Sequence, residues 1–139
     1  MKITLIIGLP GSGKTTLAYK LANEDKTNHI KTCVVDDIVD QNQLPNDNDC
    51  EHLIITDVNF CDEGLLTKAV ARLNKLYKNV AIIYIYFENN QEQCRHNVEH
   101  RNDGRNVEGT IIRFAPIYKV PNNITPIEVP QPNKENDNG

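Results

Sequence analysis

The sequence predicts an α/β fold in which a small parallel sheet of about four strands is flanked by helices. Three observations predict it. Short apolar runs alternate with stretches whose apolar residues recur at helical spacing, a glycine-rich loop joins the first run to the first helical stretch, and acidic residues directly follow two later runs. Strands that alternate with helices favour parallel pairing through right-handed crossovers, and the ligands of such sheets bind beyond the carboxyl ends of the strands.

Length and composition bound the class of protein. The chain has 139 residues, which fits one domain, and its net charge of -4 argues against a protein that coats nucleic acid by charge alone. The longest apolar run, residues 81–87, is too short to cross a membrane, and the N-terminal run is too short for a signal peptide. We therefore expect a cytoplasmic protein, in the host cytoplasm if the source is viral. The cysteines are Cys33, Cys50, Cys61 and Cys94, and no two of them form a C-x-x-C pair. We therefore expect their thiols to stay reduced.

The first strand and the first helix have distinct patterns. Residues 2–7 are mostly apolar and rich in β-branched side chains, as in a strand that is buried on both faces. Past the glycine-rich loop, apolar residues recur four positions apart, as Leu17 and Leu21 do. This spacing predicts a helix that begins at Lys14, packs on the sheet and frays near residues 23–25.

The second and third predicted strands each end at carboxylates. The apolar runs 32–35 and 53–56 predict these strands, and Asp36-Asp37 follows the first run while Asp57 follows the second. In a parallel sheet the carboxyl ends of all strands lie at one edge. We therefore expect these carboxylates beside the glycine-rich loop.

The second half of the chain continues the alternation. Either Asn59 or Asp62 can cap the next helix, and Asn-Asp-Gly at 102–104 interrupts a polar helical stretch. The remaining predicted elements, in chain order, are a helix over 65–77, a strand over 80–87, a helix over 89–101 and a helix over 107–115. Residues 1–120 form the predicted domain, and residues 121–139, rich in Pro and Asn, are predicted to be a disordered polar tail.

The glycine-rich loop is the strongest functional signal. Residues 8–15, GLPGSGKT, match the phosphate-binding pattern G-x-x-x-x-G-K-[ST], the P-loop, between a predicted strand and a predicted helix. Its glycines let backbone N–H groups surround a phosphate, Lys14 can reach the β- and γ-phosphates, and Thr15 can ligate Mg²⁺. The sequence therefore predicts a three-layer P-loop NTPase fold that binds ATP, or GTP in its place, with Mg²⁺. The predicted nucleotide-binding residues are Gly8, Pro10, Gly11, Ser12, Gly13, Lys14, Thr15 and Thr16.

The carboxylates supply the next part of the predicted chemistry. Asp57 is the candidate second Mg²⁺ ligand, acting through water beside Thr15, although an Asp in this place is often a plain turn residue or a helix cap. Asp36 is the candidate general base that orients a hydroxyl acceptor and takes its proton. Asp37 is the alternative base, but two adjacent carboxylates repel each other, and Asp37 could instead cap a short helix over 38–44.

Several arginines follow the fourth predicted strand: Arg95, Arg101, Arg105 and Arg113. Each by itself fits a solvated helix face with exposed salt bridges. As a group, on a polar helix and a glycine-bearing loop, they favour a lid that brings a guanidinium onto the transferred phosphoryl group. Arg101 is the first candidate for this catalytic role, and Arg95 and Arg105 are further candidates for nucleotide binding.

Together these residues resemble the P-loop kinase domain of the bacteriophage-type polynucleotide 5′-hydroxyl kinases and their relatives among small ATP-binding kinases. The resemblance covers most of residues 1–118. It implies that Asp36 is the general base, that Lys14 and Thr15 serve ATP·Mg²⁺, and that Arg101 is the lid arginine. The motifs that carry it are GLPGSGKTT at 8–16, VVDD at 34–37, ITDVN at 55–59 and RHNVEHRNDGRNV at 95–107.

The acceptor side departs from that family. Its nucleic-acid members tend to carry an arginine shortly after the paired acids, where Ile38 and Val39 stand here, and the crossover from Asp37 to Leu53 is short and polar. The predicted function is transfer of the γ-phosphate of ATP to a hydroxyl, with a polynucleotide 5′ end, a modified base or a nucleoside as the leading acceptor. Two alternatives stay open: a small-molecule kinase of the sugar or antibiotic type, and an ATP-binding module without catalysis.

Overall fold

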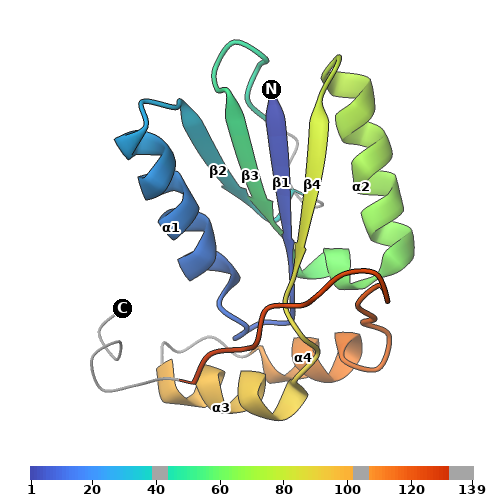
Figure 1. Ribbon diagram of the computed structural model, residues 1–139. Coiled ribbons are helices and arrows are strands. Elements are labelled where there is room, and N and C mark those ends of the chain that lie inside the picture. Colours follow the sequence, from blue (N-terminus) through green and yellow to red (C-terminus); the bar gives the residue numbers. More distant parts are fainter. Residues whose placement is uncertain (39–43, 102–106, 132–139) are drawn as a thin grey trace.

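A parallel sheet lies at the centre of the molecule. The computed structural model describes residues 1–38, 44–101 and 107–131. The four strands pair in parallel in the order β2-β3-β1-β4 (Figure 1), which confirms the predicted α/β fold and its small parallel sheet. The strands are Lys2–Ile7 (β1), Thr32–Asp36 (β2), His52–Thr56 (β3) and Ala81–Tyr86 (β4).

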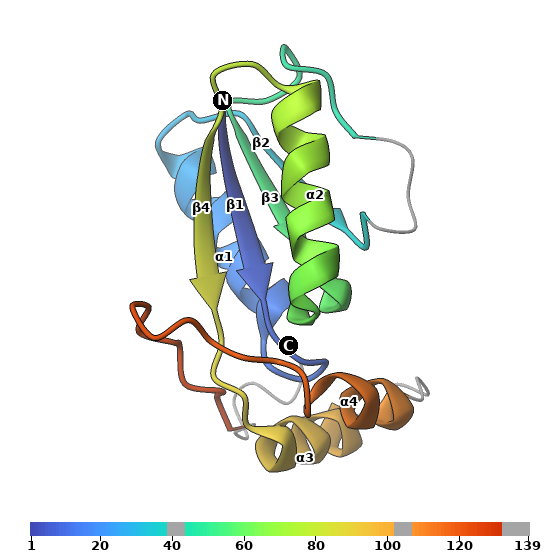
Figure 2. The same cartoon turned by 90° about the vertical axis from the view of Figure 1, so that its right-hand side faces the viewer.

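Helices cover both faces of the sheet and its carboxyl end. Figures 1 and 2 show α1 (Lys14–Thr27) on one face and α2 (Glu63–Leu76) on the other. Beyond the carboxyl ends of the strands lie α3 (Gln91–Arg101) and α4 (Glu108–Phe114). A short 3-10 helix, Val58–Cys61 (η1), follows β3 where the sequence pattern predicts no helix. In the part of the chain that the structure describes, no helix is long and apolar enough to span a membrane.

The apolar runs are buried to different extents. Ile3 and Leu5 of β1 have no exposed surface, because β3 and β4 flank this strand and helices lie on both faces. β4 is an edge strand, and its Ile83 and Tyr84 keep 42% and 38% of their surface exposed. An apolar run therefore predicts a strand of this sheet but does not distinguish its centre from its edge.

Aspartates determine where two helices begin or end. Asp62 caps α2, because its Oδ1 accepts hydrogen bonds from the backbone N–H groups of Gly64 (2.9 Å) and Leu65 (3.2 Å). This finding selects Asp62 from the two predicted caps. Helix α1 continues to Thr27, past the predicted fraying at residues 23–25. The last turns of α1 are stabilised because Asp25 forms hydrogen bonds with residues of the sheet.

Asp25 belongs to a polar network beneath α1. Its Oδ2 accepts hydrogen bonds from the Thr32 hydroxyl (2.7 Å) and from His52 Nδ1 (2.5 Å), and His52 Nε2 lies 2.7 Å from the Thr4 hydroxyl. Burial raises the pKa of Asp25, but the hydrogen bonds from Thr32 and His52 outweigh it and hold this pKa below its usual value. The network joins the end of α1 to β1, β2 and β3.

Residues 121–131, named the strap here, are ordered against the domain, so the predicted disordered tail is wrong for this segment. Ile127 forms a parallel bridge with Phe87, its N–H donates to Tyr86 O (2.8 Å), and its carbonyl accepts from the N–H of Glu88 (2.8 Å). Val129 is only 3% exposed. The Pro and Asn content predicts disorder, but the backbone of Ile127 pairs with the end of β4 and the side chain of Val129 is buried. Residues 132–139 lie outside the described residues.

Candidate active site

The P-loop between β1 and α1 has a backbone that depends on its glycines. Gly11 and Gly13 have φ angles of +85° and +103°, in the left-handed region that glycine adopts without strain. At Gly8, a Cβ atom would lie 2.5 Å from Ser12 Oγ. The N–H of Ser12 closes the turn on Leu9 O (3.1 Å). A side chain at any of these glycines would therefore strain or obstruct the loop.

Two polar groups of the P-loop suit a bound phosphate. Ser12 Oγ is fully buried and has no hydrogen-bond partner among the described residues, which is unusual unless a ligand supplies one. Lys14 Nζ donates to Leu9 O (3.0 Å). Burial lowers the pKa of the Lys14 ammonium, and the nearby carboxylates of Asp36 and Asp37 oppose this shift. An unsatisfied hydroxyl, an ammonium and the amino end of α1 meet here, so these residues fit a phosphate chain.

A cavity of about 330 Å³ opens beside the P-loop. It lies among the P-loop, the carboxyl ends of β2 and β3, the end of α3 and the start of α4. It brings together the P-loop lysine, the predicted general base, both predicted Mg²⁺ ligands and one predicted lid arginine. Its described lining residues are Pro10, Gly11, Gly13, Lys14, Thr15, Thr16, Asp36, Asp37, Thr56, Asp57, Val58, Arg101, Val107 and Thr110.

The three aspartates reach this cavity in different ways. Asp36 is the exposed last residue of β2 and stands opposite Thr56 in the pairing with β3. Asp37 turns the chain with a φ of +57°, while its N–H donates to Thr56 O (2.8 Å). Asp57 is 1% exposed, and its Oδ1 accepts hydrogen bonds from the backbone N–H (2.9 Å) and the side-chain amide (3.0 Å) of Asn59. Asp57 thus caps η1 and also lines the cavity.

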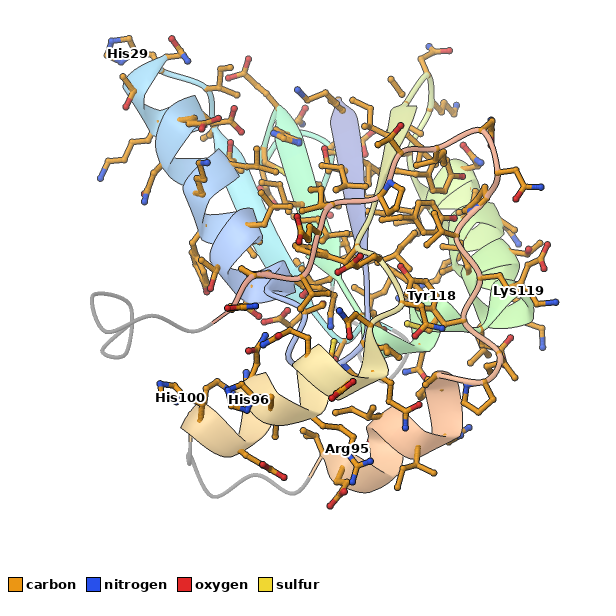
Figure 3. The ribbon with its side chains drawn as sticks, turned by 60° about the horizontal axis from the view of Figure 1, so that its bottom comes forward. His29, Arg95, His96, His100, Tyr118 and Lys119 are labelled. Atoms are coloured by element: carbon orange, nitrogen blue, oxygen red, sulfur yellow. The ribbon has the colours of Figure 1, made fainter. Side chains whose placement is uncertain are left out.

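The predicted lid arginines are separated by the structure. Arg101, the last residue of α3, lines the cavity. Arg95 is not among the described lining residues and forms an ion pair with Glu108 of α4. Figure 3 shows Arg95 between α3 and α4. Six residues along a helix turn the side chain by about 600°, which places these two arginines on different faces. Arg105 lies outside the described residues, as does most of the short helix predicted over 38–44.

Sequence reasoning missed several lining residues. Thr56 directly precedes Asp57, so the end of the third predicted strand already contained a signal for it. Thr110 and Val107 come from the region of α4, where no motif includes Thr110 and the motif at 95–107 that ends at Val107 indicates only its arginines. They line the cavity only because α4 packs across the carboxyl end of the sheet.

Comparison with known proteins identifies the family of this chain. Residues 1–98 match the family described as Novel STAND NTPase 3. The chain belongs to this NTPase family. Over 104 residues it is 31% identical to R277, an uncharacterized protein of Acanthamoeba polyphaga mimivirus, and the match covers 75% of each chain.

The fold of this NTPase is similar to that of a solved kinase. A gluconokinase from Sinorhizobium meliloti 1021 matches with a TM-score of 0.57 and 10% sequence identity, over 94% of this chain and 84% of that chain. The predicted P-loop NTPase fold is therefore confirmed, and family membership supports nucleotide binding. The narrower resemblance to polynucleotide 5′-hydroxyl kinases stays a prediction.

Proposed function

We propose that this NTPase transfers the γ-phosphate of ATP to a hydroxyl acceptor. The observation that carries the proposal is that two carboxylates, Asp36 and Asp37, line the same cavity as Lys14 of the P-loop. A kinase needs a carboxylate beside the transferred group, because it orients the acceptor hydroxyl and takes its proton. A site that only binds nucleotide with Mg²⁺ uses an acidic side chain such as Asp57 to hold the metal, but it gains nothing from two further carboxylates near the phosphates, since like charges repel.

The P-loop residues would hold the nucleotide. The backbone N–H groups of the P-loop would bind the phosphates, Ser12 Oγ would gain a hydrogen-bond partner, and Lys14 would reach the β- and γ-phosphates. Thr15 and Asp57 would hold Mg²⁺, which when bound neutralises charge on the phosphoryl oxygens. The described residues contain no cluster of three His, Cys, Asp or Glu suited to a metal ion, so the phosphates would provide part of the coordination.

Asp36 is the proposed general base. It is exposed at the end of β2, where an acceptor can approach it. The N–H of Asp37 is bound to Thr56 O and its backbone is left-handed, so we assign Asp37 the supporting role of shaping the turn. Arg101, at the end of α3, would direct its guanidinium to the transferred phosphoryl group.

The charge of the cavity favours a neutral or cationic acceptor. Besides Lys14 and Arg101, which serve the phosphates, no described lining residue is basic, and none is aromatic. A polynucleotide 5′ end brings phosphates and bases, which proteins bind with cations and stacking surfaces. We therefore rank sugars and aminated antibiotics first, nucleosides next, because they bring a base but no phosphate, and polynucleotide 5′ ends last. The fold it shares with a gluconokinase is compatible with a small acceptor.

A second candidate is nucleotide hydrolysis, in which water takes the place of the hydroxyl acceptor. Membership in a family described as an NTPase favours this candidate. The same P-loop would bind the nucleotide, and Asp36 would orient the water instead of an alcohol. The two reactions therefore differ only in the product that carries the γ-phosphate.

The test follows labelled γ-phosphate from ATP·Mg²⁺ to nucleosides, sugars, aminoglycosides and 5′-hydroxyl oligonucleotides. It compares wild type with Lys14→Ala and Asp36→Asn, and with Asp47→Asn, a matched change at an exposed turn. We expect a labelled small molecule that disappears in the first two variants and persists in the third. Label that appears only as free phosphate would identify hydrolysis. ATP binding without either product would overturn catalysis and leave a nucleotide-binding module.

A further inference from the structure

Helix α3 packs directly against the tip of the P-loop. A Cβ atom on Gly11 would lie 2.4 Å from the backbone O of Cys94 and 2.9 Å from Val98 Cγ2. Cys94 itself has no exposed surface. Asn97 is three residues after Cys94, on the same side of α3, and so faces the P-loop as well.

Asn97 uses its whole amide at this contact. Its Nδ2 donates to Gly11 O (2.9 Å) and to Pro130 O (2.8 Å). Its Oδ1 accepts a hydrogen bond from Gln93 Nε2 (2.9 Å). Because Gln93 donates to the oxygen, both N–H bonds of Asn97 must point at the two carbonyls. One side chain therefore joins the P-loop to the strap.

The bond from Asn97 holds a peptide group of the P-loop from outside. That peptide group joins Gly11 to Ser12, and its N–H donates to Leu9 O (3.1 Å) within the loop. Leu9 O also accepts the hydrogen bond from Lys14 Nζ (3.0 Å). A rotation of this peptide would therefore disturb the carbonyl that positions the P-loop lysine.

The strap also runs beside the second left-handed glycine of the loop. A Cβ atom on Gly13 would lie 3.5 Å from Pro130 Cγ, so a side chain at this position would touch the strap. Val129 holds the strap in place, because it is 3% exposed and its N–H donates to Glu88 Oε1 (3.1 Å). The strap is thus linked to the P-loop through the amide of Asn97, and its Pro130 lies beside Gly13.

We propose that Asn97 is a positioning residue that couples the strap to the P-loop, so that nucleotide binding and strap packing strengthen each other. The inference rests on nucleotide binding, as in the proposed function, but not on the identity of the acceptor. A loop already held in its binding conformation loses less freedom when phosphate binds. The coupling is reciprocal, so bound nucleotide stabilises the strap by the same factor.

The test compares wild type with Asn97→Ala and with Asn97→Asp, which keeps the shape but turns a carboxylate toward two carbonyls. The matched control is Gln91→Ala, an exposed amide in the first turn of α3. We expect the affinities for ATP·Mg²⁺ and for inorganic tripolyphosphate, measured by calorimetry, to fall about tenfold in both Asn97 variants. When ATP·Mg²⁺ is added, hydrogen exchange at the N–H groups of Ile127 and Val129 should slow in wild type and in the Gln91→Ala control. It should not slow in the two Asn97 variants.

The outcomes separate this inference from the proposed function. If wild type binds no ATP, the proposed function fails. If wild type and Asn97→Ala bind ATP equally, and exchange in the strap slows in both, the coupling is wrong while nucleotide binding stands. Thermal melting without ligand checks that each variant is folded. If neither Asn97 variant folds, Gln93→Ala replaces them: weaker ATP binding than in Gln91→Ala supports the coupling, and equal binding overturns it.

Discussion

The substitution Asp25→Ala should destabilise the fold while leaving the P-loop intact. Asp25 lies near the end of α1, and its Oδ2 holds the Thr32 hydroxyl and His52 Nδ1. Without the carboxylate, His52, which is 4% exposed, keeps a buried N–H group that has lost its acceptor. The last turns of α1 then lose their attachment to the sheet.

The magnitude follows from the lost hydrogen bonds. A hydrogen bond to a charged group contributes about 1.5–3 kcal/mol, and an unpaired buried donor costs about 1–3 kcal/mol. The Asp25 side chain is 13% exposed, so water screens part of this energy. Taking the low end of each range gives a loss of about 2.5 kcal/mol. For 139 residues the entropy of unfolding is about 0.3 kcal/mol/K, so the Tm should fall by about 8 °C.

Thermal unfolding followed by circular dichroism measures this loss, with Asp47→Ala as the exposed control. The pKa of Asp25 is lower in the folded chain than in the unfolded chain. Its contribution is therefore complete above the unfolded pKa and is lost as the pH falls through the folded pKa. Below about pH 4, wild type should lose stability faster than Asp25→Ala. A Tm change under about 3 °C at neutral pH, or identical pH profiles, would refute the reasoning.

Three further predictions concern the P-loop, two arginines of α3 and a buried thiol. Gly11→Ala should weaken ATP binding at least about tenfold in calorimetry, because the backbone at Gly11 is left-handed and a Cβ atom there would meet the backbone of α3; wild-type affinity would contradict this. Arg95→Ala should change the free energy of unfolding by less than about 0.5 kcal/mol and leave phosphoryl transfer unchanged, since the ion pair of Arg95 with Glu108 is exposed. Arg101→Ala should slow phosphoryl transfer, because Arg101 lines the cavity. Equal transfer rates in the two variants would argue against the lid role of Arg101. Burial raises the pKa of Cys61 to about 12, so mass spectrometry should find its thiol unmodified by iodoacetamide at about pH 8 until the chain unfolds.

Local patterns predicted the parts of this fold that local physics determines. The run at 2–7 became β1 because a central parallel strand must be apolar on both faces. The P-loop motif was recognisable because its glycines meet backbone requirements, as the left-handed Gly11 and Gly13 show. Asp36 and Asp57 could be placed near Lys14 because the carboxyl ends of parallel strands share one edge. Each inference needed only the spacing of neighbouring residues and one rule of topology.

The remaining features depend on partners that are distant in sequence. The strap is rich in proline, so composition predicted disorder, yet Ile127 pairs with the end of β4 and Val129 is buried. In the sequence, Arg95 and Arg101 are equivalent candidates on one polar helix. Only the position of α4 in the structure shows that Arg95 forms an ion pair with Glu108. Asn97 lies within the motif at 95–107, but no sequence pattern predicts its contact with the P-loop. The acceptors of its hydrogen bonds are backbone carbonyls, which any residue could supply.

The two ends of the sheet carry separable properties. The network of Asp25, His52 and Thr4 lies toward the amino ends of the strands, whereas the P-loop and the aspartate-lined cavity lie at their carboxyl ends. Asp25→Ala should therefore lower the Tm without changing ATP affinity, whereas Gly11→Ala, which strains the P-loop itself, should weaken ATP binding. Helix α1 connects the two ends, since it runs from Lys14 of the P-loop to Thr27, and β2 and β3 also carry residues of both the network and the cavity. If Asp25→Ala also weakened ATP binding, the loss of the network would have to shift α1 or these strands at the phosphate site.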